Sequence, residues 1–201
     1  MFTKTQALIM QVFASKIIEK FSINQISKII KKPYPLVHRS IRVLIDKGFI
    51  IKDSKGFLEL NYKENHQELT YIESLRKKDI LSKDKLVSLF VKDVINSLKE
   101  EFFIFLIFGS FVESKNNRDI DVLLIINDKE KINQIEKIVN NIASNFTVKF
   151  DINIISVESA YEMLSKRDKI NILNESLNKN IILFGTENFY RILKNARWKE
   201  N

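Results

Sequence analysis

The sequence predicts an α+β chain in which a small helical unit with a β-hairpin precedes a mixed sheet with helices on one face. Two patterns predict this class. Residues 1–62 contain three short amphipathic stretches and then two strand-like runs, whereas residues 83–201 alternate apolar strand-like runs with helical stretches. The chain has 201 residues, 45% of them hydrophobic and 29% charged, which suits one large domain or two small ones with a buried core.

The first two helices are indicated by apolar spacing and by a capping signal. Residues 5–20 place apolar side chains on one broad face, which predicts a helix over that range. Ser22 and Gln25 have the spacing of a capping box, and they predict a second helix over residues 23–32.

A third helix and a hairpin complete the first unit. Pro35 suits the first turn of a helix, and Gly48 suits the position just after its end. Residues 49–60 then predict a hairpin of two short strands, with residues 53–56 as the turn between them.

Most of the excess positive charge lies in this first unit. The whole chain has a net charge of +8, and residues 1–62 hold 11 Lys and Arg against 4 Asp and Glu. The rest of the chain holds 22 basic and 21 acidic residues. This asymmetry favours a nucleic acid or another acidic partner for the first unit.

A polar segment joins the first unit to the second. Residues 63–82 lack a strong apolar stripe and predict a helical connector, and residues 83–201 form the second unit, whose first helix covers 83–100 with Ser82 as a candidate cap. Four apolar runs predict strands at Phe103–Phe108, Ile120–Ile126, Val148–Ile155 and Ile181–Phe184. Further helices are predicted from a cap at Asn127 to Ile142 and over 156–164, 170–177 and 189–198. With helices on one face, the other face of the sheet is left open for a site.

Gly109 and Ser110 follow the first of these strands, and two acids open the next one. Gly109 suits a tight turn with bare backbone, and Ser110 begins a short helix whose free N–H groups favour phosphate oxygens. After a spacer of eight residues come Asp119 and Asp121, whose side chains point to the same face of a strand. Two adjacent carboxylates repel each other unless a cation lies between them, and Mg²⁺ prefers such oxygens.

A third acid is expected near this pair. Lys149, Asp151 and Asn153 alternate with apolar residues, which places all three on the open face. An acid inside an apolar strand is costly without a partner, so Asp151 is a third candidate metal-binding residue. The alternative is that Asp119 and Asp121 only cap a turn at the start of a strand.

These residues resemble the nucleotidyltransferase fold of the DNA polymerase β superfamily, most closely its minimal nucleotidyltransferases. The family pattern is an apolar strand, Gly-Ser, a spacer, Asp-x-Asp and a third acid on a neighbouring strand. The resemblance covers about residues 83–190. The spacer here is shorter than is usual in the family, and Ser114 stands where the family often has glycine.

The resemblance implies transfer of a nucleoside monophosphate from an NTP to a hydroxyl acceptor on a protein, an RNA or a small molecule, with release of pyrophosphate. Asp119, Asp121 and Asp151 would be the catalytic acids and would hold two Mg²⁺ ions. Asp151 would also accept the proton of the acceptor hydroxyl.

The same resemblance assigns nucleotide binding to the turn and its spacer. Gly109 and Ser110 would hold the outer phosphates of the NTP. Lys115 and Arg118, on the spacer, are further candidates for phosphate contact, with ordinary solvated loop charges as the alternative.

The segment PYPLVHRSIRVLIDKGFI, with the helices before it and the hairpin after it, resembles a winged helix-turn-helix over residues 1–62. The resemblance implies that the third helix is a recognition helix and that basic residues around it contact phosphates. The nucleic-acid contacts that it implies are Lys31, Lys32, Tyr34, His38, Arg39, Arg42, Lys52 and Lys55. A basic helix face that binds protein is the alternative, and because winged helices often form dimers, a homodimer stays open.

Several classes of site and location are excluded or disfavoured by composition. The chain has no cysteine, so it has no disulfide, thiolate nucleophile or Cys-ligated zinc, and two histidines are too few for a His-based metal site. The N-terminus lacks a signal-peptide pattern, and no apolar run approaches the ~20 residues of a membrane span. We therefore expect a cytoplasmic protein without a membrane partner.

Three functions are compatible with the sequence. The first is an active nucleotidyltransferase whose first unit delivers it to a nucleic acid or a protein, and the intact acid triad favours this function. The second is a DNA-binding transcription regulator whose second unit senses a nucleotide without catalysis or mediates dimerisation. The third is an interaction module without enzymatic activity.

Overall fold

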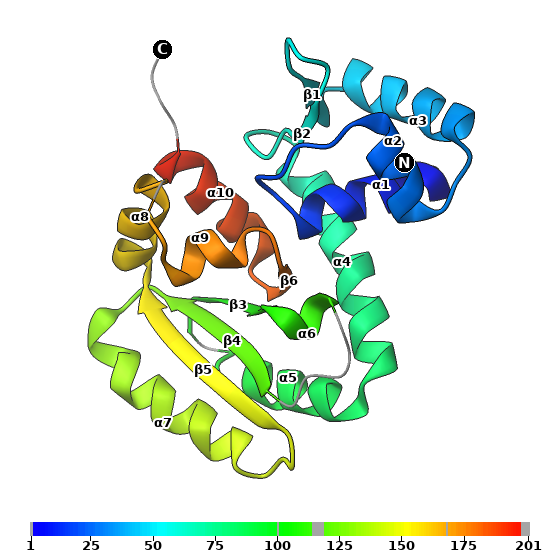
Figure 1. The fold of residues 1–201 in the computed structure, drawn as a ribbon. Coiled ribbons are helices and arrows are strands. Elements are labelled where there is room, and N and C mark those ends of the chain that lie inside the picture. Colours follow the sequence, from blue (N-terminus) through cyan, green and yellow to red (C-terminus); the bar gives the residue numbers. More distant parts are fainter. Residues whose placement is uncertain (1, 100, 114–118, 168, 198–201) are drawn as a thin grey trace.

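The computed structural model describes residues 2–99, 101–113, 119–167 and 169–197. Within them the fold is mixed α+β, and a smaller helical unit precedes a four-stranded mixed sheet with its helices (Figure 1). We call residues 2–62 the N-terminal unit; all of them are described, and they form three helices and an antiparallel hairpin. Its elements are α1 (Lys4–Ser15), α2 (Ile23–Ile30), α3 (Tyr34–Asp46), β1 (Ile50–Lys52) and β2 (Leu58–Leu60).

Local signals set the start of α2, the first turn of α3 and the hairpin turn as the sequence predicted. The hydroxyl of Ser22 accepts a hydrogen bond from the Gln25 N–H, and the Gln25 side chain accepts one from the Ser22 N–H, which completes the capping box of α2. Pro35 lies in the first turn of α3. In the hairpin turn, Asp53 Oδ1 accepts hydrogen bonds from the N–H groups of Lys55 and Phe57, at 3.0 and 2.9 Å. The predicted helices and hairpin are therefore confirmed as elements.

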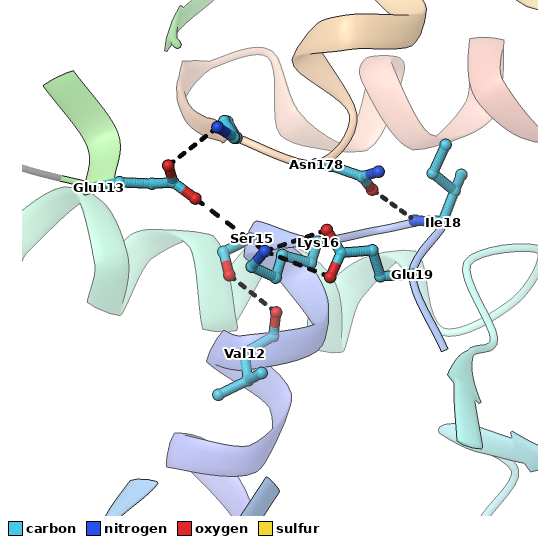
Figure 2. Close-up of polar contacts among 8 residues, drawn as sticks. Val12, Ser15, Lys16, Ile18, Glu19, Glu113 and Asn178 are labelled. Atoms are coloured by element: carbon cyan, nitrogen blue, oxygen red, sulfur yellow. Dashed lines mark hydrogen bonds and ion pairs between the residues drawn. The ribbon is translucent and has the colours of Figure 1, made fainter. Parts of the chain in front are cut away.

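The first helix is shorter than predicted and ends at Ser15 instead of continuing to residue 20. The Ile17 N–H donates to the Leu177 carbonyl at 2.9 Å, so it is not available for a helical bond. The Ile18 N–H donates to Asn178 Oδ1 at 3.3 Å (Figure 2). Contacts with a distant segment thus override the apolar period, which continues past Ser15 in the sequence.

The elements after the N-terminal unit build the mixed sheet. They are α4 (His66–Lys83), α5 (Lys85–Ser97), β3 (Phe103–Phe108), α6 (Ser110–Glu113), β4 (Asp119–Ile126), α7 (Ile132–Ala143), β5 (Lys149–Ser156), α8 (Val157–Ser165), α9 (Ile172–Ser176), β6 (Asn180–Phe184) and α10 (Thr186–Ala196). The strand order is β5-β4-β3-β6. Strands β4 and β5 are parallel, and β3 is antiparallel to both of its neighbours.

The prediction that helices cover only one face of this sheet is wrong, because helices pack on both faces (Figure 1). Alternate residues of β3 belong to two different buried clusters. Phe103, Phe105 and Ile107 pack in the cluster that contains α5 and α7, whereas Ile104, Leu106 and Phe108 pack in the cluster that contains α8, α9 and α10. All six residues of β3 are buried, and a strand that is apolar on both faces needs cover on both.

Helix α4 packs along the free edge of β6. The predicted connector is helical, and its polar side chains bind the edge groups of the strand: Arg76 donates to the Asn180 carbonyl, and Lys77 donates to the Leu183 carbonyl at 2.6 Å. These bonds satisfy backbone groups that a neighbouring strand would otherwise pair.

The remaining helices and strands lie within a few residues of their predicted ranges, although two caps differ. Asp84, rather than Ser82, caps α5 and accepts hydrogen bonds from the N–H groups of Leu86 and Val87. Asp128, rather than Asn127, caps a short 3₁₀ turn that precedes α7. In the described part of the chain, no helix is both long enough and apolar enough to cross a bilayer.

Candidate active site

The parallel pair β4 and β5 brings the three predicted acids to one end of the sheet. Strand β4 begins at Asp119 and β5 begins at Lys149, and their register places Asp119 beside Lys149 and Asp121 beside Asp151. Because side chains alternate along a strand, these four side chains share one face. Helices α8, α9 and α10 cover this face further along, but Asp119 and Asp151 lie at its exposed end.

Gly109 lies directly against Asp121. Phe108, the last residue of β3, is the register partner of Asp121, and the chain then turns at Gly109 with a φ of +77°. A β-carbon built on Gly109 would lie 2.3 Å from Asp121 Oδ2, closer than two non-bonded heavy atoms can approach. The absence of a side chain at Gly109 therefore makes room for the Asp121 carboxylate, as well as allowing the turn.

The turn after β3 is held by the segment that precedes β6. The Gly109 N–H donates to the Lys179 carbonyl at 2.9 Å, and the one-turn helix α6 then begins at the exposed Ser110. Glu113, at the end of α6, forms an ion pair with Lys179 at 2.9 Å. It also lies 4.0 Å from Lys16 (Figure 2). Lys16 of the N-terminal unit thus lies beside α6, the short helix that follows the Gly-Ser turn.

Burial and the two neighbouring acids make ionisation of Asp121 unfavourable. Asp121 is half-buried, and burial raises its pKa, with the charges of Asp151 and Asp119 adding to that rise. Lys149 acts in the opposite direction on the Asp121 pKa. Lys149 Nζ lies 3.3 Å from Asp119 Oδ2, and it is one ammonium group at an end of the sheet that holds three carboxyl groups. This end of the sheet therefore favours a further cation.

The donor set matches Mg²⁺ in its chemistry, because it consists of carboxylate oxygens on neighbouring strands. Because Gly109 has no side chain, the Asp121 carboxylate has room beside the turn, as a carboxylate that binds a ligand there would need. As the side chains lie, however, no three His, Cys, Asp or Glu residues among those described converge closely enough to hold an ion. Asp119 is directed to Lys149 instead.

The predicted phosphate-binding residues fall into two groups. Gly109 and Ser110 lie at the same end of the sheet as the acids. Lys115 and Arg118 lie outside the described residues.

The basic residues predicted to bind nucleic acid lie on exposed parts of the N-terminal unit. Val37, Ser40, Ile41 and Leu44 face inward from α3, whereas the predicted contact residues of α3 are exposed. Tyr34 and His38 are stacked, with ring centroids 6.0 Å apart. The exposed set is Lys31, Lys32, Tyr34, His38, Arg39 and Arg42 around α3, with Lys52 and Lys55 on the hairpin.

Sequence reasoning left two lysines of this region without a role. Lys149 precedes Asp151 by two residues, so strand alternation alone places it on the face of the acids. Lys179 holds Gly109 through its carbonyl group, and no sequence pattern marks such a backbone contact.

Comparison of this chain with protein-family models, with curated proteins and with solved structures gave no significant match. The functional assignment therefore depends on the residues of the site and their geometry.

Proposed function

We propose that this chain is a Mg²⁺-dependent nucleotidyltransferase that transfers NMP from an NTP to a hydroxyl acceptor and releases pyrophosphate. The observation that carries the proposal is the contact between Gly109 and the Asp121 carboxylate, with Asp151 beside Asp121 in register. This contact joins the Gly-Ser turn to the acidic residues in a single site. Phosphate oxygens need a bare, N–H-rich turn, and a metal-bound triphosphate needs carboxylates next to it.

The residues divide into two roles. Gly109, whose own N–H is bound to the Lys179 carbonyl, leaves bare backbone for the close approach of the outer phosphates, and Ser110 binds them, so that pyrophosphate departs away from the acceptor. Asp119, Asp121 and Asp151 would hold Mg²⁺, which when bound neutralises the triphosphate and acidifies the acceptor hydroxyl. Asp151 is exposed, and its carboxylate accepts the proton of that hydroxyl as the oxygen attacks the α-phosphorus.

The order of the strands and the position of the Gly-Ser turn support this proposal. We infer a polymerase β-like nucleotidyltransferase fold for the sheet with its helices, because β3 ends in the Gly-Ser turn and lies beside the strand with the acidic pair. We infer a winged helix-turn-helix for the N-terminal unit from its three helices and hairpin. In this proposal the N-terminal unit positions the enzyme on a nucleic acid.

A second candidate function is DNA-binding regulation of transcription, with a sheet domain that binds a nucleotide without catalysis or mediates dimerisation. The observation that favours it is the exposed set of basic and aromatic residues on α3. Both functions use this surface, and they differ in whether the bond between the α- and β-phosphates breaks.

Transfer of labelled phosphate tests the proposed reaction. The full chain is incubated with Mg²⁺, with fractionated RNA and protein acceptors, and with NTPs labelled on the α- or the γ-phosphate. We expect the α-label to join an acceptor and the γ-label to appear in pyrophosphate. Asp121→Asn should abolish both signals, whereas Asp93→Asn, at an exposed position of α5, should leave them unchanged. Transfer of the γ-label, or α-label transfer that survives Asp121→Asn, would contradict the proposal.

A further inference from the structure

Lys149 is a cation built into the acidic end of the sheet. It is the first residue of β5 and the register partner of Asp119, and it lies on the same face as Asp151, two residues further along. Its Nζ contacts Asp119 Oδ2 at 3.3 Å, and its charge also acts on Asp121. The proposed reaction uses the three acids and the Gly-Ser turn, and it gives this side chain no role.

We propose that Lys149 binds the triphosphate of the incoming NTP, and that it neutralises Asp119 when no nucleotide is bound. This inference rests on the proposed function, because it places a triphosphate at the acids. A Lys ammonium on its flexible stem contacts phosphate as a mobile point charge. The side chains of Lys149 and Asp119 are 72% and 56% exposed, so their ion pair exchanges easily for other partners.

The ion pair of Lys149 with Asp119 differs in geometry from that of Lys131 with Glu101, which lies away from the acids. Lys131 donates to both oxygens of Glu101, at 2.7 and 2.9 Å, and its side chain is 40% exposed. Lys149 makes one longer contact, and it does so at a site where three carboxyl groups compete for positive charge. If Asp119 held a divalent cation, the Lys149 ammonium would lose this partner and would be available to the anionic triphosphate.

Removal of the ammonium should therefore change two affinities in opposite directions. A divalent cation alone competes with Lys149 for Asp119, so a neutral side chain at this position should strengthen its binding. The NTP loses an attractive charge, so its binding should weaken. A solvated surface ion pair without a role in binding would not produce this opposition.

The experiment compares Lys149→Met and Lys149→Arg with Lys131→Met in the full chain. Calorimetry measures the affinity for Mg²⁺ without nucleotide, and then the affinity for NTP at saturating Mg²⁺. For Lys149→Met we expect Mg²⁺ binding to tighten by about threefold and NTP binding to weaken by about tenfold. Lys149→Arg keeps the charge and should restore most of the NTP affinity, and Lys131→Met should change neither affinity.

The failures are distinguishable. If the native chain binds NTP and Lys149→Met binds it equally well, or if both affinities shift in the same direction, the role of Lys149 is refuted and the proposed function is unaffected. If the native chain binds no NTP, the proposed function fails and the triphosphate role of Lys149 fails with it. Circular dichroism of each variant tests whether the fold is intact. We expect an intact fold for the Lys149 variants because this side chain is exposed.

Discussion

Gly109 is subject to two separate constraints, a positive φ of +77° and the contact with Asp121 Oδ2. In Gly109→Ala the new methyl group cannot fit without displacing the Asp121 carboxylate. We therefore expect the substitution to weaken Mg²⁺-dependent NTP binding by at least about tenfold, in addition to a loss of about 1 kcal/mol of stability from backbone strain. Calorimetry and urea unfolding of the variant measure the two effects.

Gly48 provides a matched control for this substitution. Its φ is +72°, but no heavy atom of the described residues lies within 4 Å of the β-carbon position, so Gly48→Ala introduces similar strain without any contact at the site. We expect a similar loss of stability and unchanged NTP binding. Equal NTP affinities for Gly109→Ala and Gly48→Ala would show that the contact with Asp121 does not matter for binding.

The raised pKa of Asp121 links the site to stability. Burial and two like charges raise this pKa above the ordinary value of 3.8. A carboxyl group with a higher pKa in the folded chain than in the unfolded chain destabilises the fold above the folded pKa, and this effect disappears as the pH falls through that pKa. Asp121→Asn should thus stabilise the chain at pH 7 by about 0.5 kcal/mol, a size that allows for solvent screening.

Urea unfolding at several pH values tests this sign. The gain from Asp121→Asn should shrink as the pH falls toward 3.8, where the native carboxyl group is increasingly neutral in both states. Asp93→Asn, at an exposed position of α5, serves as the control for removal of one acidic side chain away from the site. If Asp121→Asn instead destabilises the chain at pH 7, the ionised carboxylate stabilises the fold through favourable contacts, and the predicted sign is wrong.

Helix α4 shows how an element with a polar sequence can be essential to a sheet. Glu73 and Arg76 are 1% and 7% exposed, and the Arg76 guanidinium donates to Glu73 Oε1 at 2.6 Å as well as to the edge of β6. Tyr190 of α10 adds a hydrogen bond to the same Glu73 oxygen. Arg76→Met should destabilise the chain by about 3–5 kcal/mol, because it leaves Glu73 buried without its partner.

The double variant Glu73→Leu/Arg76→Met should be less destabilised than Arg76→Met alone, since it removes the uncompensated charge. Lys83→Met breaks an exposed ion pair with Asp79 in the same helix and should cost under about 1 kcal/mol. Denaturant unfolding compares the three. If Arg76→Met is no more costly than Lys83→Met, α4 does not secure the edge of β6.

The elements also show what the sequence could and could not predict. Periodicity, caps and turn residues located every strand and the Gly-Ser turn, and strand alternation placed Asp119, Asp121 and Asp151 on one face. The early end of α1, the cover on both faces of the sheet and the role of α4 depend on contacts between distant segments, such as Ile17 with Leu177. From its sequence, α4 looks like a solvent-exposed polar helix. Its polar side chains bind strand carbonyls more than 100 residues further along the chain, and local sequence patterns do not reveal such contacts.

At the scale of the full chain, the two units differ in net charge, and we propose that they bind different ligands. If the exposed residues of α3 contact phosphates, the Arg39→Ala/Arg42→Ala variant should bind duplex DNA more weakly and with a smaller salt dependence. The slope of log K against log salt should fall by about 1 for each phosphate-binding side chain that the variant removes. Fluorescence anisotropy at several salt concentrations measures this slope.

Lys92→Ala/Lys137→Ala removes two exposed positive charges from α5 and α7, and it serves as the control for overall charge. We expect its slope to match that of the native chain. Equal reductions in both double variants would indicate attraction by net charge alone and would remove the basis for a nucleic-acid interface on α3.

The central claim is that the Gly-Ser turn and the three acids form one binding site for a metal-bound NTP. Calorimetric titration of NTP into the native chain, with and without Mg²⁺, and into Asp119→Asn/Asp121→Asn tests it most directly. We expect binding that requires Mg²⁺ and is abolished in the double variant, because the variant removes two of the three acids that would hold the ion. No binding to the native chain, or equal binding to the double variant, would contradict the claim.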